Sequence, residues 1–278
     1  MLLLLASTGC DSLFGLGDVH STVGAADAGL GPWSTPVAEQ IAFGIGDDPT
    51  LPGDMLELYF NLDDDIYLST RPTLGDPWSS PVPVAELNST AMETTPEISR
   101  DGLTMFFGTA RPGSLGLDDL MFSTRPTRAD AWSPPAFVPE LNSPASEDGG
   151  AISEDGFELV FTSTRSATKQ IYTSRRFSRA GLWPAPVPET QLDSVGINFS
   201  AYLSPDRLTI YWSTNRAGTY DIYQAHRAHA GDPYSNIIPV AEANTSDDET
   251  DPWISPDGHD LYFVRATTTS SMLMHATR

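Results

Sequence analysis

Cysteine and basic residues are scarce in this chain of 278 residues. Cys10 is the only cysteine, so the chain forms no internal disulfide. Fifteen Lys and Arg residues stand against 37 Asp and Glu residues, which gives a formal net charge of −22. A charge of this sign and size repels phosphate backbones at every approach, so we expect no DNA or RNA partner.

Long apolar runs and catalytic signatures are missing as well. Beyond the first residues no stretch is long enough to span a bilayer. The five histidines form no His-Glu-x-x-His pattern, and there is no nucleophile elbow and no phosphate-binding loop. These absences favour a non-enzymatic protein without a cofactor, but they leave an enzymatic activity open.

A repeated segment dominates what is present. A turn with a leading Asp is followed five times by a short strand that ends in an aromatic residue, at 54–60, 101–107, 155–161, 206–212 and 257–263. The leading Asp residues lie 47 to 54 residues apart, so the period is near fifty residues. A period of this size, written in strand-like segments, predicts an array of β units.

Each unit contains signals for four strands. An aromatic residue opens a Pro-rich outer strand, and the five openers are Trp33, Trp78, Trp132, Trp183 and Tyr234. A short apolar inner strand such as 96–99 follows, then the repeated strand, then a third such as 119–125. Four strands in each unit predict the blade of a β-propeller.

The two ends of the repeat region complement each other. Residues 250–278 supply three strands of a last blade, and the segment from Trp33 to about Ile41 is an outer strand without the other three. If this segment completes the last blade, no strand edge stays open. We therefore predict an all-β, five-bladed propeller with four-stranded antiparallel blades, formed as a single domain by residues 33–278.

The repeat resembles the WD-repeat-like propellers of the TolB type. The resemblance rests on Ser-Pro-Asp-Gly at 255–258, Leu-Tyr-Phe at 261–263, and Asp-Ile-Tyr at 65–67 and 221–223. Such propellers serve mostly as interaction platforms in bacterial envelopes, so the resemblance implies a protein or glycan partner there. TolB itself resembles a six-bladed ring with a separate N-terminal domain, and because this chain shows neither, the particular partners of TolB are not carried over.

The N-terminal segment Met1 to Cys10 resembles a bacterial lipoprotein signal. The resemblance implies that residues 1–9 are removed and that Cys10 is lipidated. Residues 10–32, rich in Gly, Ala, Ser and Asp, then read as a flexible tether. This predicts a monomer anchored to a membrane of the envelope, facing the periplasm or the cell surface. The segment lacks a positive start and its apolar core is short, so a truncated or non-functional signal is the alternative.

One polar position of the repeat predicts a binding site. Three residues before the inner strand the chain carries Glu93, Glu147, Asn198 and Glu249. In a propeller this position enters the innermost strand at the mouth of the central channel, so the four side chains would form a ring that attracts cations. The alternative is that they cap or pair with nearby arginines.

Calcium is the natural metal candidate for such a ring, because it takes carboxylate and amide oxygens. No EF-hand spacing is present, and the acidic run 247–251 alone is a weak indication. A second acidic cluster, 62–65 with Asp118 and Asp119, is expected to mark solvated hairpin loops.

Arginine recurs at a fixed position where the third strand of each unit ends, as Arg71, Arg125, Arg175, Arg227 and Arg278. Repetition at one position favours a structural role over chemistry. We expect these guanidinium groups to bridge to the turn carboxylates Asp101, Asp155, Asp206 and Asp257.

Two functions from different classes remain. The favoured one is a non-enzymatic, lipid-anchored propeller that binds an envelope protein or glycan at its channel mouth or loops. The alternative is a glycan-active hydrolase that uses Glu93, Glu147 and Glu249, since that chemistry needs two carboxyl groups across one pocket. Unequal carboxylates in a deep cleft favour the hydrolase, and a shallow face with exposed aromatic residues favours the binding protein.

Overall fold

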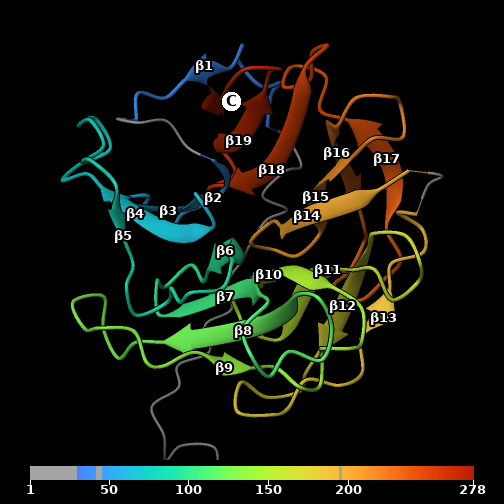
Figure 1. Cartoon of the computed structure of the whole chain (residues 1–278). Coiled ribbons are helices and arrows are strands. Elements are labelled where there is room, and N and C mark those ends of the chain that lie inside the picture. The colour runs from blue at the N-terminus through green and yellow to red at the C-terminus, as the bar shows by residue number, and fades with distance from the viewer. Residues whose placement is uncertain (1–29, 42–45, 194–195) are drawn as a thin grey trace, which may run out of the picture.

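Five four-stranded antiparallel sheets surround a central channel in the computed structural model, which describes residues 30–41, 46–193 and 196–278 (Figure 1). The predicted fold class is confirmed. From the channel outward, blade 1 consists of β2 (Asp47–Thr50), β3 (Glu57–Leu62), β4 (Asp65–Thr70) and β5 (Val82–Pro83). Blade 2 consists of β6 (Glu93–Ile98), β7 (Thr104–Thr109), β8 (Asp119–Thr124) and β9 (Ala136–Phe137).

The other three blades repeat this order. Blade 3 consists of β10 (Glu147–Ile152), β11 (Glu158–Ser163), β12 (Gln170–Arg175) and β13 (Val187–Pro188). Blade 4 consists of β14 (Asn198–Leu203), β15 (Thr209–Thr214), β16 (Asp221–His226) and β17 (Ser235–Pro239). Blade 5 consists of β18 (Asp248–Ile254), β19 (Asp260–Ala266), β20 (Ser271–Thr277) and β1 (Val37–Ala38).

The ring is closed by the N-terminal strand, as predicted. Strand β1 pairs antiparallel with β20, with Val37 opposite His275. His275 forms ion pairs with Glu39, at 3.1 Å, and with Asp260, at 2.7 Å, and its ring stacks on Tyr262 at 4.2 Å. Burial opposes the charged imidazole, but the two carboxylates raise the pKa of His275 to about 9. A charged histidine therefore ties the closing strand to the last blade.

The aromatic residue of each repeated strand fills the space between the sheets. The five side chains are wholly buried and are Phe60, Phe107, Phe161, Trp212 and Phe263. Alternate residues of these strands face the adjoining blades, so burial of the aromatic surface stabilises the ring as a whole.

The recurrent arginines are structural, but in a different way from that expected. Each one stacks on the opening aromatic residue of its blade, with 4.0 to 4.6 Å from guanidinium to ring centroid, in the pairs Arg71–Trp78, Arg125–Trp132, Arg176–Trp183, Arg227–Tyr234 and Arg278–Trp33. Each Nε donates to a backbone carbonyl of the preceding turn, as from Arg125 to Gly102 at 2.7 Å. Blade 3 uses Arg176 at this position, not Arg175.

The turn carboxylates are occupied locally instead. Asp101 accepts hydrogen bonds from the Ser99 hydroxyl at 2.6 Å and from the Leu103 N–H at 3.0 Å. The same pair of bonds recurs in the other turns, so the Asp serves to shape the hairpin. Asp155 also forms an ion pair with Arg207 of the next blade, at 3.1 Å.

The predicted membrane anchor lies in the N-terminal segment before the propeller. Within the described ranges no helix is long and apolar enough to cross a membrane. Residues 1–9 and Cys10 lie outside the described residues, as does most of 10–32. The signal, the lipidation and the tether therefore stay predictions, and so does the division of the chain at residue 33.

Candidate functional site

A backbone bulge interrupts the inner strand of every blade at the same place. The register between the first and second strands shifts there, and one residue takes a left-handed conformation with φ between 47° and 64°. The five residues are Asp48, Thr95, Gly149, Ser200 and Asp251. Four of them are not glycine, and each left-handed non-glycine residue costs on the order of 1 kcal/mol. Bulges of this kind re-aim side chains, and they are frequent beside functional sites.

Hydrogen bonds connect the bulges of neighbouring blades. The Gly149 N–H donates to the Thr95 hydroxyl at 2.9 Å, and the Asp48 N–H points to a carboxylate oxygen of Asp251 at 3.5 Å. The Asp251 N–H donates to the Ser213 hydroxyl at 3.0 Å. These contacts hold the bulge side chains in a fixed arrangement around the channel.

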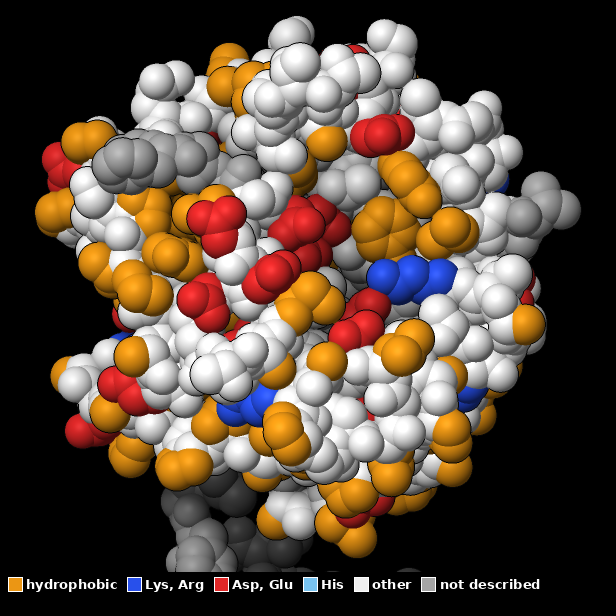
Figure 2. Space-filling view, in the orientation of Figure 1, with side chains coloured by type: hydrophobic (Ala, Val, Ile, Leu, Met, Phe, Trp, Pro, Cys, Tyr) orange, Lys and Arg blue, Asp and Glu red, His pale blue; other side chains and the backbone are white. Residues whose placement is uncertain are grey.

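Four of the five bulge residues, all except Gly149, line a pocket of about 610 Å³ at the end of the channel where the inner strands begin. We call this pocket the mouth. Its acidic lining consists of Asp47, Asp48, Asp64, Asp118, Asp148, Asp248 and Asp251. Lys169, the only lysine of the chain, also lines it, together with Phe199 and Tyr220. Figure 2 shows acidic side chains gathered around the hollow at the centre of this face, with a basic side chain at its rim.

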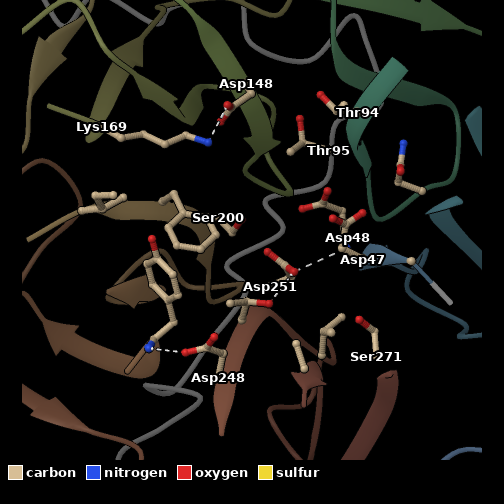
Figure 3. Close-up of a pocket in the computed structure, with 18 of the residues that line it drawn as sticks. Asp47, Asp48, Thr94, Thr95, Asp148, Lys169, Ser200, Asp248, Asp251 and Ser271 are labelled. Carbon is tan, nitrogen blue, oxygen red and sulfur yellow. Dashed lines mark hydrogen bonds and ion pairs between the residues drawn. The ribbon is translucent and has the colours of Figure 1, made fainter. Parts of the chain in front are cut away.

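Three of the mouth carboxyl groups approach one another from two blades. In Figure 3 the side chains of Asp47, Asp48 and Asp251 turn toward the same part of the pocket. Burial, reinforced by the charge of Asp251, raises the pKa of Asp47 to about 6. Burial, together with the charges of Asp251 and Asp47, raises the pKa of Asp48 well above its usual range. The group is therefore short of positive charge.

Across the mouth, Asp148 is paired with Lys169 at 2.8 Å (Figure 3). Burial raises the pKa of Asp148, although the ammonium group works in the opposite direction. Lys169 also lies over the Phe199 ring, with Nζ at 5.3 Å from the centroid, and that ring meets Tyr220 edge-on at 5.2 Å. The mouth thus already holds one ammonium group between a carboxylate and an aromatic face.

The three predicted glutamates lie just behind the mouth, fully buried in their own blades. Each accepts hydrogen bonds from a Ser or Thr four residues earlier, and each forms an ion pair with an arginine in or just after the second strand. The ion pairs are Glu93–Arg111 at 2.8 Å, Glu147–Arg165 at 3.1 Å and Glu249–Arg265 at 2.6 Å. The alternative interpretation, pairing with nearby arginines, therefore describes their contacts, and direct ligand binding by them stays a prediction.

Asn198 follows the same plan with an amide. Its oxygen accepts from Trp212 Nε1 at 3.2 Å and from Arg216 at 3.3 Å, and its nitrogen donates to Gln170 at 2.7 Å. In blade 1 this position is Gly46, where a Cβ atom would lie 2.5 Å from the Asn61 carbonyl oxygen. The ring of four polar residues is thus a layer that supports the mouth from behind.

Much of the pocket lining comes from the next two positions along the inner strands, such as Asp47, Asp48, Thr94, Thr95 and Asp251. The sequence signal for them was weak, because the residue at these positions changes from blade to blade. Asp48 and Asp251 each precede a proline at the same repeat position, which is the one indication that the chain offered.

The other acidic clusters contribute more than expected. Asp64 and Asp118, expected in solvated loops, line the mouth, as do Asp248 and Asp251 of the run 247–251. Asp119 is buried and accepts hydrogen bonds from the backbone N–H groups of Leu115, at 2.6 Å, and Gly116. In the part of the chain that the structure describes, no three Asp, Glu, His or Cys side chains are grouped to hold a metal ion. Calcium binding stays a prediction.

Comparisons with known proteins agree with the fold. No family model matches the chain, and no curated protein matches it. The protein is a β-propeller of five blades, and its solved structural neighbours include TolB proteins. A TolB-type protein of Agrobacterium tumefaciens has a TM-score of 0.55 at 19% identity over 82% of this chain and 72% of its own. TolB of Acinetobacter baumannii has a TM-score of 0.51 at 19% identity, over 83% and 54%.

A glycan-active enzyme is also among the neighbours. The endo-arabinase of Bacteroides thetaiotaomicron has a TM-score of 0.63 at 15% identity and covers 89% of this chain and 98% of its own. At these identities the comparisons show a shared fold and nothing about the chemistry at the mouth.

Proposed function

We propose that this protein is a non-enzymatic binding propeller of the bacterial envelope, whose acidic mouth takes a cationic group of a protein partner. The observation that carries the proposal is the composition of the mouth, where seven aspartates and a single lysine line one pocket. A lysine or arginine side chain, or an N-terminal amine, has the complementary charge.

Electrostatics supports a cation as the missing component. The pKa values of Asp47 and Asp48 are raised because the surrounding protein reduces their contact with water, partly for Asp47 and more fully for Asp48, and because both lie beside Asp251. A positive charge placed among them favours their ionised forms and relieves their mutual repulsion. Phe199 and Tyr220 offer aromatic surface beside the carboxylates, the combination that binds Lys169 within the same pocket.

The envelope assignment rests on different support. The TolB-like neighbours and the lipoprotein-like segment ending at Cys10 both favour it. Lipidation of Cys10 is part of the proposal, with mass spectrometry of the protein expressed in a bacterial host as its test. Residue 10 carrying acyl chains is the expected result, and an unmodified Met1 start contradicts it.

The binding proposal is tested by calorimetric titration with trilysine. We expect binding at pH 7.5 that weakens as the pH falls below about 6, where Asp47 takes up a proton. The double variant Asp47→Asn, Asp251→Asn should bind about tenfold more weakly, because it removes two charge-assisted contacts. The matched control is Asp76→Asn, Asp130→Asn, which changes the net charge equally in loops outside the mouth. Equal weakening in both variants would refute a specific site.

A glycan-active hydrolase is the second candidate, favoured by one observation. Asp47, with its pKa raised to about 6, faces Asp251 of another blade, and acid-base hydrolysis requires two carboxyl groups across one pocket, one of them with a raised pKa. Glu93, Glu147 and Glu249 are buried against arginines, so Asp47, Asp148 and Asp251 are the residues that this chemistry would use. Release of sugar from arabinan by the parent, and none by Asp47→Asn, is the expected result for this candidate. No turnover over a panel of envelope and plant glycans rejects it.

A further inference from the structure

The opposite end of the channel carries a second pocket, of about 550 Å³, with the reverse charge. It is formed by the turns that follow the inner strands, and it includes Gly53, Ser153 and Pro256 from three different blades. Because the inner strands begin at the mouth and end at these turns, the two pockets lie at opposite ends of the channel. Arg100, Arg176 and Arg179 line this second pocket, which we call the arginine pocket.

The three guanidinium groups are held by neutral acceptors. Arg176 donates to the Gly156 carbonyl at 2.7 Å, and Arg179 donates to the carbonyls of Asp155, at 2.9 Å, and Glu154, at 3.2 Å. Within the described ranges none of the three forms an ion pair with a carboxylate, whereas eight other arginines and Lys169 do. Three arginines without an ion pair thus lie around one pocket, in a chain with 37 acidic residues.

Arg100 is the least satisfied of the three. Its Nη1 is buried without a hydrogen-bond partner, and its Nη2 makes only a 3.4 Å contact with the Ile254 carbonyl. A buried donor without a partner is unfavourable, and more so when it is charged, so an anion that accepts from it would be stabilising. A second observation shows that the positive charges lie close together: burial and the charge of Arg179 lower the pKa of Arg176.

The acidic residues at this pocket do not neutralise it. Asp101 is engaged by Ser99 and by the Leu103 N–H, and the exposed Glu154 contributes its backbone carbonyl to Arg179. At physiological salt the screening length is about 8 Å, so the carboxylates at the far mouth contribute little here. Three guanidinium groups against the two carboxylates of Asp101 and Glu154 leave the arginine pocket with a net positive charge.

We propose that the arginine pocket binds a phosphate group, either free or as a phosphate monoester. Guanidinium groups bind phosphate oxygens through paired charge-assisted hydrogen bonds, and a phosphate carries about −1.5 to −2 at pH 7, which suits several cations better than one carboxylate does. Thr104 places a hydroxyl group at the same pocket as a further donor. The site is separate from the mouth and does not depend on its function.

The test is titration of the full chain with inorganic phosphate, with ionic strength held constant by chloride. Glycerol 3-phosphate and vesicles containing phosphatidic acid are the parallel arms, which distinguish a soluble monoester from a lipid headgroup as the source. We expect binding that weakens about tenfold in Arg176→Gln and in Arg179→Gln. Arg179 is exposed, so its variant keeps the test valid if Arg176→Gln does not fold.

Arg71→Gln is the matched control. Arg71 occupies the repeat position of Arg176, stacks on Trp78 at the same 4.2 Å, and lies outside the arginine pocket. It should bind phosphate like the parent, as should the mouth variant Asp47→Asn, Asp251→Asn. The proposal is overturned if phosphate does not bind in any arm, or if Arg179→Gln and Arg71→Gln bind it equally well.

Discussion

The two ends of the channel have opposite charge although the same repeat builds both. At the mouth, bulge residues present aspartates to the pocket. At the other end, the turn aspartates are consumed by hairpin hydrogen bonds and arginines face the pocket. At the mouth the residues that recur in every blade are structural, and the varying residues beside them give the pocket its charge. At the other end the recurrent Arg176 contributes to the charge together with Arg100 and Arg179.

The layer between the ends separates them. Tyr202 and Trp253 are buried on adjacent inner strands, with ring centroids 6.0 Å apart. Glu97 lies at the same level and accepts a hydrogen bond from the Thr50 hydroxyl at 3.0 Å. Burial raises the pKa of Glu97 to about 8, so this carboxyl is mostly protonated at neutral pH. The two pockets should therefore respond independently to mutation.

The largest expected effect comes from removing the support of the mouth. Glu249→Ala leaves the Arg265 guanidinium without its carboxylate in a buried position, which should cost about 3–5 kcal/mol of unfolding free energy. Urea unfolding measures the loss, with the isosteric Glu249→Gln as the milder control. A Glu249→Ala variant as stable as the parent contradicts the supporting role.

The next effect tests the layer between the two ends. A carboxyl with a raised pKa destabilises the fold as the pH rises above its unfolded value near 4.5, and the penalty is complete above the folded value near 8. Glu97→Gln should therefore raise the unfolding free energy by about 4 kcal/mol at pH 8, and by almost nothing at pH 4. Unfolding curves at both pH values measure this gain, and the affinities for trilysine and phosphate should stay unchanged in the variant. A stability gain that does not depend on pH contradicts this explanation.

Ring closure should affect both ends together. The pKa of His275 is raised from about 6.5 to about 9, so its stabilising contribution is present below pH 6.5 and is lost as the pH rises through 9. We expect about 2 kcal/mol of the unfolding free energy to disappear over this range. His275→Gln should remove that part of the pH dependence, and an unchanged profile in this variant would show that the histidine does not tie β1 to the ring.

The smallest expected effect separates function from stability at the mouth. Asp47 has a pKa raised to about 6, so its ionised form destabilises the protein above that pH. Asp47→Asn should gain about 1 kcal/mol at pH 7.5, after allowing for solvent screening at this exposed position, and nothing near pH 4. Thermal unfolding checks the gain. A loss of stability at pH 7.5 contradicts the electrostatic description of the mouth.

The fold could be predicted from the sequence, and the candidate site could be predicted only in part. Five turn-and-strand copies with fixed punctuation predicted the blades, and the segment after Trp33 predicted closure onto β20. The position of Glu93 and its equivalents predicted the level of the mouth, since the chain enters the channel there. Which side chains face the pocket depends on the bulge, which shifts the register between the first and second strands by one residue. No residue type recurs at the bulge in all five blades, so the sequence did not reveal it.

The arginine pocket could not be read from the sequence for a similar reason. Arg176 recurs in every blade as a stacking residue, and Arg100 and Arg179 occupy turn and loop positions that differ from blade to blade. Only the ring geometry brings the three together.

The most direct measurement is a cross titration of two ligands against two variants. Trilysine and inorganic phosphate are each titrated into the parent, the mouth variant Asp47→Asn, Asp251→Asn, and the arginine-pocket variant Arg179→Gln. We expect the mouth variant to lose about tenfold in trilysine affinity alone, and the arginine-pocket variant to lose about tenfold in phosphate affinity alone. If each variant weakens both ligands equally, binding follows the overall charge of the protein and the two ends are not separate sites.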